Sequence, residues 1–214
     1  MALHLHLDLS APEDAPLLLA AEVIQAGGLI VYPTDTIYGI GANAWNPDAV
    51  KRVQEIKKRT ETKPILVLVD SIESVNDVAG HITDLARELM ASFWPGPLTL
   101  VMQASALLPR ALTLDRGTVG IRVPASAPCR RLLALCGVPI TSTSANLSGE
   151  KTPETAAAIE QALGPGIDLF LEGGVLPPSV PSTVVDVTGS RPRLIREGVI
   201  SFEQLSAVSA LIDR

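Results

Sequence analysis

The chain has 214 residues, of which 47% are hydrophobic, 19% charged and only 3% aromatic, and its formal net charge is −6. This apolar content suffices for a sizeable core built from Ala, Val, Leu and Ile, as is common in α/β proteins. No apolar run reaches the ~18 residues of a membrane span, and the N-terminus lacks a signal-peptide pattern, so we expect a cytoplasmic protein with no membrane contact. The acidic charge argues against a protein whose whole surface binds nucleic acid.

The first part of the chain predicts helices that alternate with strands. They are, in order, a helix over 17–26, a strand over 29–32, a loop over 33–46, a helix from 47 to about 58, a strand over 65–69 and a helix over 83–93. Gly27-Gly28 ends the first helix, because glycine readily adopts the left-handed conformation. Asn46-Pro47-Asp48 begins the second helix with a cap, a first-turn proline and an acid suited to the helix dipole.

The second part of the chain predicts further strands with fewer helices between them. They are strands over 98–102 and 118–123, a helix over 127–136, a strand at Ile140, a helix from Thr152 to Leu163, strands over 167–171 and 183–187, and a terminal helix from Ser201. Because no clear helix joins the strands over 98–102 and 118–123, we expect a mixed sheet. No repeat or linker divides the pattern, so we predict one domain over 1–214, with a core over about 15–200 and a C-terminal helix over 201–213.

The cysteines and histidines do not suggest a metal site or a disulfide. Cys129 and Cys136 lie seven apart in a predicted helix, which places their Cα atoms about 10 Å apart, beyond the ~7 Å that a disulfide tolerates. His4, His6 and His81 have no metal-ligand spacing with them. We therefore expect two free core cysteines and no transition metal.

A cluster of cations follows the second predicted helix. Six of the 17 Lys and Arg residues fall within positions 51–63, namely Lys51, Arg52, Lys57, Lys58, Arg59 and Lys63. Such a row is often only a solvated helix end, which the helix dipole favours. However, several cations held together need an anion, and arginine presents a fork that matches phosphate oxygens. We interpret the cluster as a local site for a small polyanion such as a nucleotide.

Small polar residues and two arginines follow other predicted strands. The run Ser142-Thr143-Ser144-Ala145-Asn146 supplies hydroxyls and an amide that suit phosphate oxygens, although such side chains often bond only to their own backbone. Arg122 and Arg196 each follow an apolar strand, where a charge needs a carboxylate, a phosphate or another partner, and an anionic ligand would serve both. The chain has no P-loop, no Gly-x-Gly-x-x-Gly and no Gly-x-Ser-x-Gly motif, so these residues alone indicate anion binding and nothing finer.

Several motifs, in one order along the chain, resemble those of the YrdC-like family in its short, synthase form. They are Gly28 to Gly41 (GLIVYPTDTIYGIG), Lys57 with Arg59, Lys63-Pro64, Trp94 to Thr99 (WPGPLT), Gly120 to Pro124 (GIRVP), Ser142 to Asn146 with Ser148-Gly149, Pro181 to Asp186 (PSTVVD) and Arg196-Glu197-Gly198. Motifs of this length rarely coincide in order by chance. The resemblance implies an α/β fold in which helices flank a twisted mixed β-sheet around a basic cavity.

The same resemblance implies an activity and its ligands. The activity is that of a nucleotidyltransferase that joins L-threonine, bicarbonate and ATP into threonylcarbamoyl-AMP and pyrophosphate, for the t6A37 modification of tRNA. A carbamate oxygen attacks the α-phosphorus, and fixed cations together with Mg²⁺ balance the charge that grows on pyrophosphate. No protein nucleophile is required, so the scarcity of histidine is compatible with this chemistry. The expected partners beyond the substrates are tRNA or a transferase of the same pathway.

By analogy with the family, the candidate site residues divide into two groups. Lys57 and Arg59 are the catalytic candidates. The nucleotide group is Lys57, Arg59, Lys63, Ser144, Asn146, Thr152 and Arg196. The threonine group is Thr36, Arg122, Ser142 and Ser182, with Arg122 as the partner of the amino-acid carboxylate.

The chain departs from longer members of the family in two respects, and two rival interpretations stay open. Longer members carry His where this chain has Leu68, and they add a second C-terminal domain.

One rival interpretation is a paralogue of the same fold that acts in another carbamoyl or nucleotide transfer. The other is a double-stranded RNA or tRNA binding module without chemistry, against which the acidic charge and the 3% aromatic content both speak.

Overall fold

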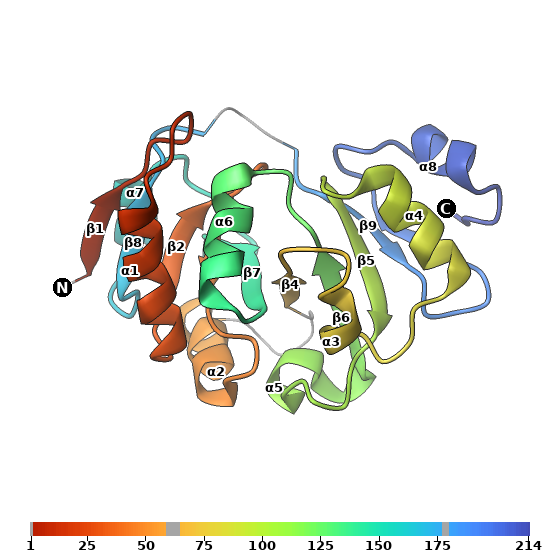
Figure 1. Cartoon of the computed structure of the whole chain (residues 1–214), viewed down its shortest axis with the longest axis horizontal. Helices are drawn as coiled ribbons and strands as arrows, with labels where there is room; N and C mark the ends of the chain where they lie inside the picture. The colour runs from red at the N-terminus through yellow and green to blue at the C-terminus, as the bar shows by residue number, and fades with distance from the viewer. Residues whose placement is uncertain (1, 59–64, 177–179) are drawn as a thin grey trace.

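A single ten-stranded sheet organises the molecule, with helices packed against it (Figure 1). The computed structural model of the protein describes residues 2–58, 65–176 and 180–214. The strands are β1 Leu3–His6, β2 Ile30–Pro33, β3 Tyr38–Gly41, β4 Leu66–Leu68, β5 Leu98–Gln103, β6 Thr118–Arg122, β7 Ile140–Ser144, β8 Leu169–Glu172, β9 Thr183–Asp186 and β10 Arg193–Arg196. The helices are α1 Asp14–Gln25, α2 Pro47–Ile56, α3 Val75–Val78, α4 Asp84–Phe93, α5 Arg110–Thr113, α6 Ala127–Cys136, α7 Ala156–Leu163 and α8 Phe202–Val208, with a short 3-10 helix η1 Leu114–Arg116.

The sheet is mixed, as predicted from the chain order of the elements. Its strand order is β1-β8-β2-β3-β7-β4-β6-β5-β9-β10. Strands β4 and β6 run parallel, whereas β7 is antiparallel to both β3 and β4, and β5 is antiparallel to β6. Strand β7 therefore lies in the middle of the sheet, beside strands that are far away in the sequence: Ser144 pairs with Gly39 of β3 and Ser142 pairs with Leu66 of β4.

Two apolar clusters cover the two faces of the sheet. In β2 the side chains alternate, as a strand requires: Ile30 and Tyr32 belong to one cluster and Val31 belongs to the other. Helices α1 and α6 pack together over the first of these faces (Figure 1). Because both faces are covered, the central strands consist almost wholly of buried residues, which explains their apolar composition.

Strand β3 lies inside the segment that we predicted as a loop. Its sequence, Tyr38-Gly39-Ile40-Gly41, carries two glycines, which are unfavourable in a strand interior and therefore hid it. The structure gives a packing reason for the second one, because a Cβ on Gly41 would lie 2.7 Å from Cε1 of Tyr32 on the neighbouring strand. The tyrosine ring takes the space that a side chain on β3 would need.

Several other boundaries differ from the sequence-based expectation. Helix α8 ends at Val208 and not at 213, and α1 begins at Asp14 and not at 17. Ser142 to Ser144 belong to strand β7 and are not a loop beyond it. Helix α7 begins at Ala156, because the hydroxyl of Thr155 caps it by accepting from the Ala158 amide, and so Thr152 does not open the helix as we predicted. Short α3 and α5, strand β1 and the 3-10 turn were also missed, since none of them has a strong sequence pattern.

The cysteines are free and buried, as predicted. Cys129 and Cys136 lie on α6 within the apolar cluster under α1. Burial raises the pKa of each thiol to about 12, so neither is a reactive thiolate at neutral pH.

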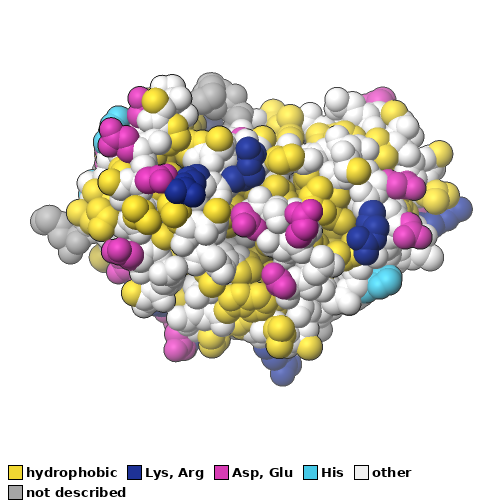
Figure 2. Space-filling model, in the orientation of Figure 1, with side chains coloured by type: hydrophobic (Ala, Val, Ile, Leu, Met, Phe, Trp, Pro, Cys, Tyr) yellow, Lys and Arg dark blue, Asp and Glu magenta, His cyan; other side chains and the backbone are white. Residues whose placement is uncertain are grey.

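Surface features add two observations. Within the described ranges, no helix is long and apolar enough to cross a membrane. On the face covered by α1 and α6, the described basic and acidic side chains are intermixed, and they form no broad basic patch there (Figure 2).

The edge strand β1 is held by a histidine whose protonation we expect to matter. The His4 ring stacks on Phe170 at 4.8 Å, and its nitrogens lie 2.6 Å from Glu172 Oε1 and 3.2 Å from Glu160 Oε2. The hydrogen bond to Glu172 is the main cause that raises the pKa of His4 above 6.5, and burial opposes it. A raised pKa means that the folded state favours the protonated ring, so this stabilisation is complete below pH 6.5 and is lost as pH rises through the folded-state pKa.

We therefore predict that His4→Gln lowers the free energy of unfolding by about 0.5–1 kcal/mol more at pH 6 than at pH 9, a modest value because the groups are partly exposed. Denaturant unfolding of both proteins at the two pH values measures this difference. An equal loss at both pH values would show that only the ring packing matters.

Candidate active site

One cavity of about 650 Å³ gathers the polar residues that the sequence singled out. The structure describes nine of the eleven predicted site residues, and all nine lie in the wall of this cavity. These are Thr36, Lys57, Arg122, Ser142, Ser144, Asn146, Thr152, Ser182 and Arg196. The other two, Arg59 and Lys63, lie outside the described residues. Which ligand each residue contacts stays a prediction.

The cavity lies over the middle strands of the sheet. Residues of β3, β4, β5, β6, β7 and β9 all contribute to its wall, together with the segment 148–154 that follows β7. In β7 the Thr141 side chain is fully buried and bonds to the Ala42 amide, whereas Ser142 lines the cavity. The strand thus presents hydroxyls to a ligand while its own backbone pairs with β3 and β4.

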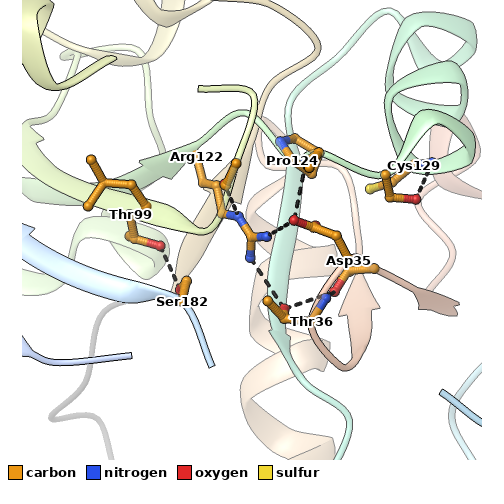
Figure 3. A network of polar contacts seen from close by, with 12 residues as sticks. Asp35, Thr36, Thr99, Arg122, Pro124, Cys129 and Ser182 are labelled. Atoms are coloured by element: carbon orange, nitrogen blue, oxygen red, sulfur yellow. Dashed lines mark hydrogen bonds and ion pairs between the residues drawn. The ribbon is translucent and has the colours of Figure 1, made fainter. Parts of the chain in front are cut away.

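Arg122 is buried and already has a counter-charge from the protein. Its guanidinium forms an ion pair with Asp35, donates from Nε to the Gly96 carbonyl at 2.9 Å and from Nη1 to Thr36 Oγ1 at 3.3 Å. Figure 3 shows the side chains of Asp35, Thr36 and Arg122 pointing toward one another. The expectation that an anionic ligand supplies the charge partner of Arg122 is therefore corrected, because the Asp35 carboxylate supplies it.

Arg196 lies on the opposite side of Ser182 and lacks such a pair. It donates to the Ser182 carbonyl at 2.8 Å and 3.2 Å, and Ser182 Oγ lies 2.9 Å from Thr99 Oγ1. No carboxylate of the described ranges lies within ion-pair distance of Arg196. Burial and the nearby charge of Arg122 both lower the pKa of Arg196, yet an arginine stays protonated at neutral pH, so its uncompensated charge is available to an anion.

Backbone contact between β10 and β9 sets the distance between Arg196 and Ser182. A Cβ on Gly198 would lie 2.6 Å from the Ser182 carbonyl carbon and 2.7 Å from the Thr183 nitrogen, so only glycine allows this close approach.

We predict that Gly198→Ala lowers the free energy of unfolding by about 1–3 kcal/mol and lowers kcat/KM of the activity proposed below on the order of tenfold, because Arg196 moves away from Ser182. Gly189→Ala is the matched control in the same region, since the nearest atom to its Cβ is 3.5 Å away. Thermal unfolding and steady-state rates measure both variants, and equal behaviour of the two would contradict the close-approach argument.

Lys57 is buried at the end of α2 and is bound by the segment after β7. Its exposed fraction is 3%, and Nζ donates to the carbonyls of Ser144 and Asn146 and to Asn146 Oδ1. The Asn146 amide in turn donates to the Glu150 carbonyl. Lys57 therefore ties α2 to the loop that carries two predicted nucleotide contacts, and its direct contact with phosphate stays a prediction.

The other described cations of the 51–63 cluster, Lys51, Arg52 and Lys58, do not line the cavity. Arg52 forms an ion pair with Asp168 at 2.9 Å and bonds to two backbone carbonyls, and Lys51 lies 3.8 Å from Glu55 on the surface of α2. Of the described members of this cluster, Lys57 alone lines the cavity. Helix α2 points its described cations in different directions, so Lys51 and Arg52 form contacts away from the cavity.

Other residues of the wall were missed by sequence reasoning. Glu150, Lys151 and Glu154 line the cavity, and Asp35 lies just behind it. The only sequence signal for Asp35 was its place between two threonines directly after a buried strand. Leu68, where longer family members carry His, is 1% exposed and packs in the apolar cluster with Tyr32, while Leu66 of the same strand lines the cavity.

The fold and the cavity define an α/β protein with a polar cavity, lined by two arginines, over the centre of a mixed sheet. The chain belongs to the Sua5/YciO/YrdC family, because residues 22–198 match the family model described as telomere recombination. The resemblance inferred from the motifs is thereby confirmed.

Relatives and solved structures agree with this membership. The chain is 37% identical over 196 residues to a threonylcarbamoyl-AMP synthase of Pyrococcus abyssi, covering 92% of this chain and 58% of the relative. It is 37% identical over 203 residues to a putative threonylcarbamoyl-AMP synthase of Mycobacterium tuberculosis, covering 94% and 93% of the two chains.

Among structures, P. abyssi Sua5 complexed with L-threonine matches with a TM-score of 0.92 at 35% identity, covering 100% of this chain and 62% of that one. E. coli YciO matches with a TM-score of 0.85 at 29% identity, covering 96% and 98%. The chain thus spans less than two thirds of the length of its Pyrococcus relative.

Proposed function

We propose that the protein is an L-threonylcarbamoyladenylate synthase, a nucleotidyltransferase that forms threonylcarbamoyl-AMP and pyrophosphate from L-threonine, bicarbonate and ATP. The observation that carries the proposal is one cavity with two different arginines, Arg122 beside a carboxylate and Arg196 without one. A volume of about 650 Å³ accommodates an amino acid and a nucleotide together. The names of the relatives and the L-threonine in the Pyrococcus structure support the same activity.

Threonine is assigned to the Arg122 end of the cavity. Arg122 has five N–H groups, of which three have partners among the described residues, so two remain for the substrate carboxylate. Thr36, Ser142 and Ser182 are the hydroxyls around this arginine that suit the threonine side chain or its carbamate. We place the nucleotide on the side of Ser144, Asn146, Thr152 and Arg196, with Lys57, Arg59 and Lys63.

The chemistry follows from this arrangement. The threonine amine and bicarbonate form a carbamate with loss of water, a carbamate oxygen attacks the α-phosphorus of ATP, and the bond to pyrophosphate breaks. We place Arg196, which donates to the Ser182 carbonyl, at the nucleotide end, where the phosphate chain meets the carbamate. Its fixed charge stabilises the negative charge that grows on the leaving pyrophosphate, and positioning supplies most of the remaining acceleration.

Mg²⁺ is the expected cofactor and arrives with ATP. The ion commonly binds one or two protein carboxylates together with substrate phosphates, and the cavity wall offers Glu150 and Glu154. Within the described ranges, no group of three or more His, Cys, Asp or Glu side chains could hold a metal ion. When bound, Mg²⁺ would neutralise phosphate charge.

The test is a reaction of purified protein with ATP, L-threonine, bicarbonate and Mg²⁺. We expect pyrophosphate release that depends on threonine, together with the mass of threonylcarbamoyl-AMP in the mass spectrum. The no-threonine reaction is the control. Bound ATP without either product would contradict the proposal and favour a paralogue with another carbamoyl acceptor.

The proposal also concerns the downstream partner of the protein and its cellular compartment. The product is a mixed anhydride of a carbamic acid and a phosphate, so a transferase that passes the threonylcarbamoyl group to tRNA must consume it. We propose tRNA or that transferase as the downstream partner. Because ATP and tRNA are cytoplasmic, the proposed activity belongs in the cytoplasm.

A further inference from the structure

The two arginines of the cavity differ in their charge environment. Arg122 and Asp35 form a buried ion pair, with side chains that are 4% and 15% exposed. Arg196 bonds to a backbone carbonyl and a hydroxyl and has no carboxylate partner among the described residues. One end of the cavity therefore carries a nearly neutral pair and the other carries a net positive charge.

Asp35 is fixed in this position by more than Arg122. Its Oδ2 also accepts from the Ala125 amide at 3.2 Å, in the segment that follows β6 (Figure 3). Its Oδ1 is buried and has no hydrogen-bond partner among the described groups. The carboxylate is thus held beside the guanidinium by two donors while water is excluded from its other oxygen.

A fixed carboxylate beside Arg122 affects different anions unequally. A monoanionic carboxylate gains hydrogen bonds from the two remaining N–H groups of Arg122 and meets one repulsion from Asp35. A dianionic phosphate meets about twice that repulsion, although its attraction to Arg122 also doubles. Compared with an arginine that has no carboxylate neighbour, Arg122 therefore loses more affinity for phosphate than for a carboxylate. For charges some 6 Å apart near a protein surface, the additional repulsion corresponds to a factor on the order of 10–100 in affinity.

We propose that Asp35 is a specificity-determining and positioning residue, which makes the Arg122 end of the cavity accept a carboxylate and reject phosphate. In this way one carboxylate sorts the two anionic substrates, so that the phosphates of ATP bind at the Arg196 end and leave Arg122 to the amino acid. Specificity of this kind needs a repulsive element as well as an attractive one. The assignment of the substrates rests on the proposed function, whereas the selectivity of Arg122 between the two classes of anion does not.

The experiment compares wild type and Asp35→Asn by calorimetry with L-threonine and with inorganic phosphate. For wild type, we expect L-threonine binding that phosphate does not weaken. For Asp35→Asn, we expect a dissociation constant for L-threonine that is on the order of tenfold higher, phosphate that competes with it, and one additional phosphate site. If Asp35 had a merely structural role, Asp35→Asn would bind both L-threonine and phosphate more weakly. Loss of phosphate binding in Asp35→Asn therefore overturns the proposal, and so does phosphate that does not compete with L-threonine.

Two controls keep the test decisive. Asp14 forms an exposed ion pair with Arg131 outside the cavity, and Asp14→Asn removes its carboxylate. This variant should bind L-threonine and phosphate as the wild type does. If Asp35→Asn does not fold, Asp35→Glu takes its place, because this variant keeps the negative charge. The proposal requires that phosphate still does not compete with L-threonine for Asp35→Glu. Competition there overturns the proposal.

Failure of the inference and failure of the proposed function give different results. Wild type that binds no L-threonine contradicts the proposed function. The number of phosphate sites in wild type and Asp35→Asn, measured with phosphate alone, still decides whether Asp35 excludes phosphate.

Discussion

Replacing Arg122 by alanine is expected to lower the free energy of unfolding by about 3–5 kcal/mol and to weaken L-threonine binding on the order of a hundredfold or more. The stability loss arises because Asp35 stays buried without its counter-charge. The binding loss arises because the two N–H groups assigned to the substrate carboxylate disappear. Denaturant unfolding and calorimetry with L-threonine measure the two effects, and ATP affinity should change far less.

An exposed arginine pair provides the control for Arg122. Arg131 bonds to Asp14 through two hydrogen bonds of 2.9 Å and 2.6 Å, but the two side chains are 50% and 52% exposed. Arg131→Ala should therefore lower the free energy of unfolding far less than Arg122→Ala does. If Arg122→Ala lowers the free energy of unfolding as little as Arg131→Ala does, burial does not make the Arg122–Asp35 pair more stabilising than an exposed pair. Equal effects on L-threonine and ATP would count against the assigned role.

If Arg122→Ala does not fold, Arg122→Lys separates stability from recognition. Lysine keeps a charge for Asp35 but cannot present two parallel N–H groups to a carboxylate. We expect a folded protein that still binds L-threonine poorly.

Sequence reasoning located most of the helices and strands because their signals are local. The cap at Asn46 and the proline after it begin α2 where predicted, and α6 has its predicted bounds. Strand β3 was missed because of its two glycines, of which Gly41 makes room for Tyr32, a requirement of the neighbouring strand that only the folded sheet shows. Such a signal is tertiary, and strand propensity does not contain it.

The candidate site shows the same limit more clearly. Motif analysis placed Arg122 in the site, but its partner Asp35 is 87 positions away in the chain, and the sheet order alone brings the two together. The density of cations suggested one polyanion site, yet Arg52 serves Asp168 and backbone carbonyls instead. Residue type thus predicts the chemistry available, whereas the pairing of charges depends on topology.

The ammonium group of Lys57 is the second feature whose removal should have a large effect. Its bonds reach Ser144 and Asn146, which are 87 and 89 positions away, and thereby hold the loop after β7 against α2. Lys57→Met keeps most of the aliphatic stem but leaves buried carbonyls without a donor. We expect a loss of about 1–3 kcal/mol in the free energy of unfolding, since removal of the buried charge offsets part of the cost.

The same substitution should lower kcat/KM for ATP on the order of a hundredfold, because a displacement of about 1 Å at the end of β7 and in the loop after it misplaces Ser144 and Asn146 relative to the nucleotide. Lys51→Met on the same helix is the control, since Lys51 is exposed and pairs only with Glu55 at 3.8 Å. Pyrophosphate release at varied ATP measures both variants. A Lys57→Met enzyme with normal ATP kinetics would show that the loop keeps its place without the ammonium group, and that Lys57 neither supports the nucleotide end of the cavity nor contacts phosphate.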